Sequence, residues 1–353
     1  MVTRRAVLGS ATAGIGLFSG CTNILGEIDG GEKTVVDMAN REISVPNNVE
    51  SLVGVGPGGL RLLSHLELTD RVSAVETAEK EQYEGEIPYN IANENEFQSK
   101  PPVGSRGGDV EYIVQSDPDV IVATTTENAK TIQQQTEIPT VYVDQGEFTG
   151  ENPLIYTAWE IIGKITGKSD RATELIEYVD QIRDDLNHRV EEENDHSDVY
   201  IGAVSHRGAR GIQATEIPHP VLEMINASTA VSVESQGKID IDREVIIDAD
   251  PEFMFFDRSN AENIQDDLDD GAYDSITAIE QGQWYWIHPE YHYQYNLSTI
   301  LSNAYFIGKK LYPDAFTDVE IAEKGDEIYR KMLGAKVLES LEATVGRYGE
   351  IRL

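Results

Sequence analysis

The sequence predicts an α/β protein in which two lobes with mainly parallel sheets stand on either side of one long helix. Segments of strand and helix character alternate along residues 51–143 and again from residue 199, which is typical of parallel sheets covered by helices. One long amphipathic stretch separates these two regions. With 353 residues and 40% hydrophobic side chains, the chain is long enough for two ordinary domains.

The first region begins with a short hairpin, Thr34–Pro46, with Asn40 at its turn. Apolar runs predict the strands, and apolar residues at helical spacing predict the helices. The strands expected after the hairpin are Ser51–Val55, Val72–Val75, Val120–Thr124 and Thr140–Val143. The helices expected between them are Leu60–Leu68 and Val110–Gln115. Together these segments form the predicted N-terminal lobe, residues 34–150.

The connecting segment, residues 151–196, has apolar residues at helical spacing over most of its length. It predicts a long amphipathic helix, with Gly167 as the candidate point of division into two. Alternation resumes in the predicted C-terminal lobe, residues 197–353. Its segments are Val199–Val204, Val221–Ile225, Arg243–Ile247, Phe253–Phe256 and Trp284–Ile287, followed by a helix over Asn296–Leu311.

One signature occurs in both regions. Glu111 lies seven residues before Pro118, and Glu244 lies seven residues before Pro251. In each copy the glutamate falls in the first turn of a short helix, and a turn with the proline leads into a strand. The helix dipole favours a carboxylate at a helix start, but it does not explain the same spacing twice. The two lobes are therefore expected to be structurally related.

The charge of the chain excludes several kinds of partner. Lys and Arg number 28 against 63 Asp and Glu, a formal net charge of −35. Such an acidic surface repels phosphate backbones and anionic lipid head groups, so nucleic acid is not expected as a partner. The acids are spread through periodic segments, which suits a halophilic surface screened by strong salt. One cysteine excludes a disulfide framework.

The first 20 residues have the three regions of an export signal: a basic start, an apolar run and small residues before the cut. The pair Arg4-Arg5 resembles the start of a twin-arginine signal. Leu17–Cys21 resembles a lipobox, so Cys21 is expected to carry the lipid, and residues 21–33 to form a lipid-anchored tether. The alternative is an ordinary signal peptide with a fortuitous cysteine. No other stretch is apolar enough for a membrane helix.

The mature chain resembles the iron-siderophore and vitamin-B12 class of ABC-importer substrate-binding proteins, the class with a helical backbone (class III). The order and spacing of its segments carry this resemblance more than any single motif. The segments are the Thr34–Pro46 hairpin, the strand into Gly54–Gly59, Asp109–Ile121, the central helix, Asp242–Pro251 and Tyr305–Phe316.

The resemblance implies two Rossmann-like lobes joined by the long helix, with a ligand cleft between them. It also implies that Glu111 and Glu244 dock to arginines of an ABC permease dimer, which works with its ATPase subunits. The protein is then an exported solute-binding lipoprotein, anchored by lipid alone to the outer face of the cell membrane. We expect a monomer without catalytic activity or cofactor.

Ligand-facing residues are expected in loops that leave the carboxyl ends of parallel strands. In the N-terminal lobe, the loop Gly56-Pro57-Gly58-Gly59 could bring backbone amides to an anion or a chelate oxygen. Arg106 adds a cation in a further loop, and Thr125 adds a hydroxyl after another strand. Arg61, beside the glycine loop, could face the ligand or the surface.

In the C-terminal lobe, Arg207 and Arg210 follow a strand, and guanidinium groups suit carboxylate, phosphate or hydroxamate oxygens. Pairing with surface acids is the alternative for both. The loop after Trp284–Ile287 contains Tyr291, His292 and Tyr293. These rings can pack on a chelate, and Tyr291 and His292 are possible ligands of ferric iron or haem iron.

The expected cargo is a ferric siderophore-type chelate. Haem, a corrinoid and an oxyanion such as molybdate or tungstate stay open as alternatives, because a glycine loop with an arginine also suits anions. A second class of function is an NAD-dependent enzyme, since Gly54-x-Gly56-x-x-Gly59 follows a strand and Glu76 ends the next one. Pro57 in the turn and the early position of Glu76 count against this enzyme.

Overall fold

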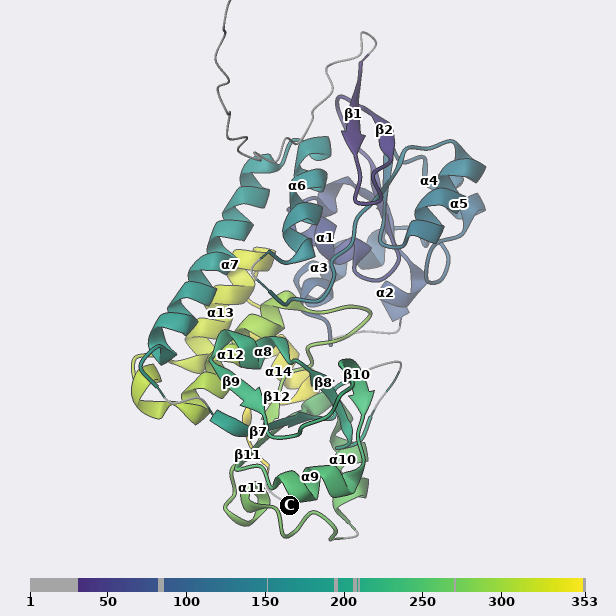
Figure 1. Cartoon of the computed structure of the whole chain (residues 1–353). Helices are drawn as coiled ribbons and strands as arrows, with labels where there is room; N and C mark the ends of the chain where they lie inside the picture. The colour runs from purple at the N-terminus through teal and green to yellow at the C-terminus, as the bar shows by residue number, and fades with distance from the viewer. Residues whose placement is uncertain are drawn as a thin grey trace, which may run out of the picture.

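The computed structural model of the chain describes residues 31–81, 86–150, 152–193, 196–205, 208, 210–269 and 271–351 (Figure 1). The expected export signal, the lipidated Cys21, nearly all of the tether and Arg207 lie outside the described residues. Within them, two α/β lobes lie one above the other and long helices run along one side (Figure 1). The predicted fold class is confirmed, and the exact domain boundaries stay a prediction.

The N-terminal lobe is built on a four-stranded parallel sheet in the order β4-β3-β5-β6. A separate antiparallel hairpin precedes it, and Asn40 has the left-handed φ of 58° at its turn, as predicted. The strands are β1 (Glu32–Val36), β2 (Glu42–Pro46), β3 (Leu52–Val55), β4 (Val72–Ala74), β5 (Val120–Ala123) and β6 (Thr140–Tyr142).

The helices of this lobe include three that apolar periodicity did not predict, namely α2, α3 and α5. Helix α3 has few apolar residues, and it buries Tyr89 and Phe97 after a proline in its first turn. The helices are α1 (Gly59–His65), η1 (Thr69–Arg71), α2 (Thr77–Glu81), α3 (Pro88–Ser99), α4 (Val110–Ser116) and α5 (Thr126–Thr136).

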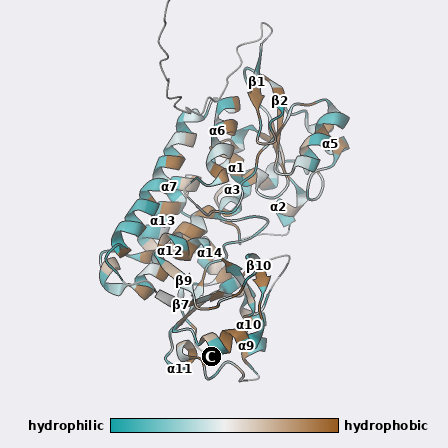
Figure 2. Cartoon of the chain, viewed as in Figure 1, coloured by the Kyte–Doolittle hydropathy of each residue, from teal (hydrophilic) through white to brown (hydrophobic). Residues whose placement is uncertain are grey.

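The connecting segment forms two helices, α6 (Leu154–Thr166) and α7 (Ser169–Val190). Gly167 ends α6 with a φ of 77°, a conformation that glycine adopts without strain. The break predicted at Gly167 is therefore present, and α7 alone is the long helix that runs beside both lobes (Figure 1). Its exposed side is hydrophilic, whereas its apolar residues face the core (Figure 2).

The C-terminal lobe has a five-stranded sheet in the order β13-β12-β11-β7-β9, parallel except for β13. Strands β8 and β10 form a separate two-stranded antiparallel sheet that the sequence did not predict. The strands are β7 (His196–Gly202), β8 (Ala214–Ile217), β9 (Ala227–Thr229), β10 (Gly237–Asp240), β11 (Phe253–Asp257), β12 (Trp284–Ile287) and β13 (Gly349–Glu350).

The segment Val221–Ile225 is mainly helical, as part of α8. Helix α9, which carries Glu244, begins at Arg243 as predicted. The helices of the C-terminal half are α8 (Pro220–Met224), α9 (Arg243–Ala249), η2 (Arg258–Asn260), α10 (Ala261–Leu268), α11 (Thr277–Glu280), α12 (Leu297–Leu311), η3 (Pro313–Phe316), α13 (Ile321–Leu333) and α14 (Leu338–Val345).

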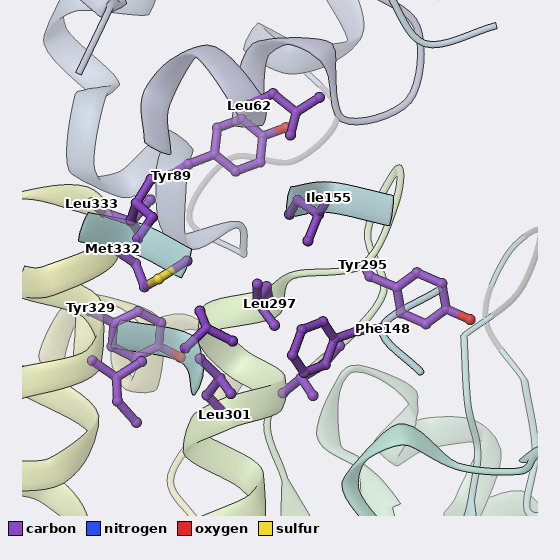
Figure 3. Close-up of a cluster of buried hydrophobic side chains, with 14 of the residues drawn as sticks. Leu62, Tyr89, Phe148, Ile155, Tyr295, Leu297, Leu301, Tyr329, Met332 and Leu333 are labelled. Carbon is purple, nitrogen blue, oxygen red and sulfur yellow. The ribbon is translucent and has the colours of Figure 1, made fainter. Parts of the chain in front are cut away.

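The largest hydrophobic core is shared by the two halves of the chain. Leu62 of α1 and Tyr89 of α3 meet Leu297 of α12 and Met332 of α13 in one buried cluster (Figure 3). The buried Arg171 of α7 reinforces the junction, because it donates to the carbonyl oxygens of His65 (3.1 Å) and Lys331 (2.6 Å). The C-terminal helices α13 and α14 also contact α3, so helices of the two halves are packed together.

Candidate functional site

The loops at the carboxyl ends of the parallel strands of the two lobes contact one another. Residues 288–295, called here the 288–295 loop, leave the end of β12 and reach the N-terminal lobe. There Arg61 donates to the carbonyl oxygen of His292 (2.8 Å), and the side-chain amide of Gln145 donates to that of Tyr295 (2.6 Å). Since Arg61 and Gln145 follow β3 and β6, this loop joins the strand ends of both sheets.

Glu76 lies at the centre of this junction. Its buried carboxylate accepts hydrogen bonds from the Gly56 amide (3.0 Å), the Gly107 amide and the Tyr293 hydroxyl (2.8 Å). Burial raises the pKa of Glu76 from its ordinary value of 4.5 to about 7, and these donors oppose the rise. The dinucleotide-binding alternative would place Glu76 against a ribose, but here its carboxylate is occupied by the protein itself.

Arg106 and Tyr293 form a stacked pair beside Glu76. The guanidinium carbon of Arg106 lies 5.0 Å from the ring centroid of Tyr293, a cation–π contact. Arg106 also borders a cavity of about 500 Å³ whose other lining residues are Thr77, Ala78, Glu81 and Ser105. The predicted ligand residues Arg106 and Tyr293 are therefore brought together from different lobes at the edge of an open cavity.

The glycine loop after β3 packs against the neighbouring loops. A Cβ atom at Gly56 would lie 2.6 Å from Thr124 Oγ1, and one at Gly58 would lie 2.7 Å from Gln145 Oε1. Both glycines have a left-handed φ, 85° and 83°. Because the Gly56 amide donates to Glu76, it is not available as part of the expected anion cradle. A ligand contact by Pro57, Gly58 or Gly59 stays a prediction.

Thr125 and Arg210 have structural partners in this arrangement. The Thr125 hydroxyl caps α5 by accepting from the Asn128 amide at 3.2 Å. The guanidinium of Arg210 lies 3.5 Å from the Asp240 carboxylate, which is the surface pairing considered as its alternative role. Their contact with a ligand stays a prediction, as does that of Arg207, which lies outside the described residues.

Tyr291 and His292 point to different partners. The Tyr291 ring lies 4.2 Å from the Lys238 ammonium, while His292 Nε2 lies 3.9 Å from a Glu86 carboxylate oxygen. Burial and the charge of Arg61 lower the pKa of His292 to about 4, so its imidazole is neutral at pH 7. In the described part of the chain, no three His, Cys, Asp or Glu side chains form a metal-binding cluster.

A buried polar cluster in the C-terminal lobe was not anticipated from the sequence. The Lys238 ammonium lies 3.6 Å from the Glu216 carboxylate and 3.7 Å from the centroid of the Tyr295 ring. The Tyr295 hydroxyl donates to Glu216 and accepts from Lys238. Burial lowers the pKa of Lys238 and raises that of Glu216. The residues come from the β8–β10 sheet and the 288–295 loop, so only the folded chain brings them together.

Two further carboxyl groups lie at strand ends of the C-terminal lobe. Asp257 ends β11 and accepts from the Ser205 hydroxyl at 3.3 Å, and burial raises its pKa to about 6. Glu290 in the 288–295 loop lies 3.5 Å from His219 Nε2, and burial raises its pKa to about 8. Together with Glu216, they make the C-terminal side of the junction rich in carboxyl groups.

Glu111 and Glu244 occupy matching positions on α4 and α9. Both side chains are exposed in the first turn of their helices, as predicted. An aspartate precedes each helix at its N-cap, and each helix ends at an aspartate with a left-handed φ, 45° at Asp117 and 44° at Asp250. The repeated sequence signature is therefore one repeated local structure, as its spacing predicted.

A family model described as periplasmic binding protein matches residues 52–291, well over half of the chain. The chain belongs to the periplasmic binding protein family. The family expected from the sequence is thereby confirmed, and this periplasmic binding protein is a solute-binding component of an ABC transporter that acts outside the cytoplasm. Within the described residues, every helix is too short or too polar to cross a bilayer.

Solved structures show the same fold. The molybdate periplasmic binding protein MolA of Haemophilus influenzae, bound to molybdate, is 17% identical with a TM-score of 0.69, over 86% of this chain and 98% of that one. The petrobactin-binding protein YclQ of Bacillus subtilis is 18% identical with a TM-score of 0.59, over 80% and 99%. The TroA-like protein FepB of Veillonella parvula is 18% identical with a TM-score of 0.64, over 86% and 97%. No curated protein matches the chain.

Proposed function

We propose that this periplasmic binding protein captures a ferric siderophore-type chelate between its lobes and delivers it to the permease of an ABC importer. The observation that carries the proposal is the Arg106–Tyr293 pair, which joins the two lobes beside an open pocket of about 500 Å³ on the N-terminal lobe. Pockets for organic ligands have about this volume, whereas a single tetrahedral oxyanion needs far less space.

The chemistry of the stacked pair supports the same cargo. A guanidinium group forms paired hydrogen bonds with carboxylate, hydroxamate or catecholate oxygens, which are the iron-binding groups of such chelates. The Tyr293 ring fixes the position of Arg106 and offers an apolar surface to an organic ligand. One of the similar structures, that of Bacillus subtilis, is a petrobactin-binding protein.

The experiment is a titration of the purified protein with ferrioxamine B, haemin, cyanocobalamin and molybdate, followed by calorimetry and intrinsic fluorescence. We expect saturable binding of the ferric chelate and at least about tenfold weaker binding by Arg106→Met, because its paired charge-assisted hydrogen bonds are lost. If only molybdate gives saturable binding, molybdate replaces the ferric chelate as the proposed cargo. The Haemophilus relative was solved with molybdate bound. Haemin or cyanocobalamin binding would redirect the assignment in the same way.

We also propose that the protein is an exported lipoprotein attached through Cys21. Support comes from the order of the basic, apolar and small-residue regions before this cysteine. In its host, labelling with a fatty acid analogue should mark the wild type and not Cys21→Ser, while Arg4→Lys with Arg5→Lys should block export by the twin-arginine route. Label on the serine variant would contradict the lipid site, and unchanged export would assign the general route.

A further inference from the structure

Four chain segments converge on the Glu76 carboxylate. Glu76 itself follows β4, the Gly56 amide belongs to the loop after β3, and the Gly107 amide belongs to the loop that carries Arg106. The third donor, the Tyr293 hydroxyl, lies on the fourth segment, the 288–295 loop after β12. One buried side chain thus connects three loops of the N-terminal lobe with one loop of the C-terminal half.

We propose that Glu76 is the positioning residue of the ligand site, which holds Arg106 and Tyr293 together by binding the loops on which both stand. The proposal rests on the proposed function only in calling this pair a ligand site. Glu76 accepts from the Gly107 amide, next to Arg106, and from the Tyr293 hydroxyl. Losing the carboxyl group of Glu76 therefore removes one hydrogen bond that positions each member of the pair.

The surroundings of Glu76 explain why a carboxyl group fits this position. All three groups that point at it are donors, and a carboxylate has enough lone pairs for all of them. The charged and titratable groups nearby are Glu79 of α2, Arg106, Arg61 and Tyr293. Glutamine keeps one carbonyl oxygen for both amides, and its NH2 group can donate to the Tyr293 oxygen, so this substitution should preserve the geometry.

The test is amide hydrogen exchange of the ligand-free protein, resolved to single residues. In Glu76→Ala, the Gly56 and Gly107 amides should exchange about tenfold faster, because each loses its acceptor. The His292 amide, which donates to Gln294 O within the 288–295 loop, should also exchange faster, although it lies in the other half of the chain. Glu76→Gln should restore protection at Gly56 and Gly107.

Two variants complete the design. Tyr293→Phe removes only the hydrogen bond from the Tyr293 hydroxyl to Glu76, so exchange should rise at His292 and stay unchanged at Gly56 and Gly107. Glu79→Gln is the matched control, because Glu79 is equally buried on the same segment but bonds to Tyr89 and Asn90 inside the N-terminal lobe. It should leave all three amides unchanged.

Unchanged exchange at Gly107 and His292 in Glu76→Ala would overturn the proposal. So would a uniform rise that includes the Val143 amide, bonded to Ala123 O in the sheet, because this indicates general destabilisation. If Glu76→Ala does not fold, unchanged exchange at His292 in Tyr293→Phe overturns it instead. Absence of binding to every compound of the titration panel would refute the proposed cargo, while the exchange result would still decide the role of Glu76.

Discussion

Glu76 gives the protein a pH dependence that can be calculated in sign. Its folded pKa of about 7 lies above the ordinary 4.5, so the folded state binds the proton more tightly than the unfolded state. The contribution of this group therefore favours folding most below about pH 4.5 and declines as the pH rises to about 7. Above about pH 7 the ionised carboxylate of Glu76 stays buried, and its unfavourable contribution to the free energy of folding no longer changes with pH.

Glu76→Gln removes the ionisable carboxyl group and therefore tests this pH dependence. Between about pH 5 and pH 8, the free energy of unfolding of the wild type should fall relative to the variant, by up to roughly 3 kcal/mol. Urea unfolding at several pH values measures this difference. The exposed Glu94 on α3 provides the control, and Glu94→Gln should give a difference that does not change with pH. A pH-independent difference for Glu76→Gln would contradict the burial of its charge.

Lys238 and Glu216 form a pair whose members depend on each other. Both side chains are buried and the Tyr295 hydroxyl connects them. Lys238→Met leaves the Glu216 carboxylate without its cation, so the free energy of unfolding should fall by about 3 kcal/mol. The double variant with Glu216→Gln should recover much of this loss, as measured in a double-mutant cycle. Additive losses would mean that the two groups do not interact.

At the scale of elements, most strands and the two repeated helices could be predicted from the sequence. Strands such as Leu52–Val55 and Val120–Ala123 are buried on both faces and appear as continuous apolar runs. Helix α3 could not be predicted, because it has few apolar residues and depends on tertiary contacts of Tyr89 and Phe97. The pairing of β8 with β10 could not be predicted either, because α8 and β9 lie between them in the chain and the pair forms no part of the main sheet.

The candidate site was predicted in part. Arg106 and Tyr293 were expected because they lie in loops at strand ends, and that rule depends only on topology. The role of Glu76 and the pair of Lys238 and Glu216 could not be predicted, because their partners are distant in sequence and meet only through the packing of the two halves. The only sequence signal for these three residues is a carboxyl or ammonium group that lies in a strand or at the end of one.

The left-handed turn at Gly167, which separates α6 from α7, can be tested by substitution. Gly167→Ala places a Cβ in a left-handed conformation with φ of 77°, so the free energy of unfolding should fall by about 1 kcal/mol. Gly167→Asn is the matched variant and should lose less, because asparagine tolerates this conformation. Chemical denaturation measures both. Equal stability of the wild type and both variants would show that the chain does not need the left-handed turn here.

At the scale of the whole molecule, Glu111 and Glu244 provide one exposed carboxylate on each lobe. We propose that both dock to arginines of the permease, since opposite charges steer and orient such contacts. Glu111→Lys with Glu244→Lys should abolish uptake in the host and leave ligand affinity unchanged. Glu94→Lys, at an exposed position on α3, is a control with the same charge change as each single reversal. Parallel loss of ligand binding would place the pair in the ligand site instead.

The shared core sets a limit on how far the lobes can separate. Helices of the C-terminal half pack on α1 and α3 in the shared core (Figure 3). In addition, the 288–295 loop is hydrogen-bonded to the N-terminal lobe at three points. Large opening would expose this core to water, which costs free energy in proportion to the apolar area. Ligand entry is therefore expected to need only a small movement at the strand ends.

Native mass spectrometry with an absorbance spectrum of the protein purified from its own host tests most directly whether it carries a ferric chelate. We expect the purified protein to contain one bound organic molecule with one iron atom and to have the colour of a ferric chelate. The mass should return to that of the bare chain when the iron is removed by reduction and chelation. A haem spectrum would change the cargo, and a tightly bound nicotinamide dinucleotide would contradict the transport function altogether.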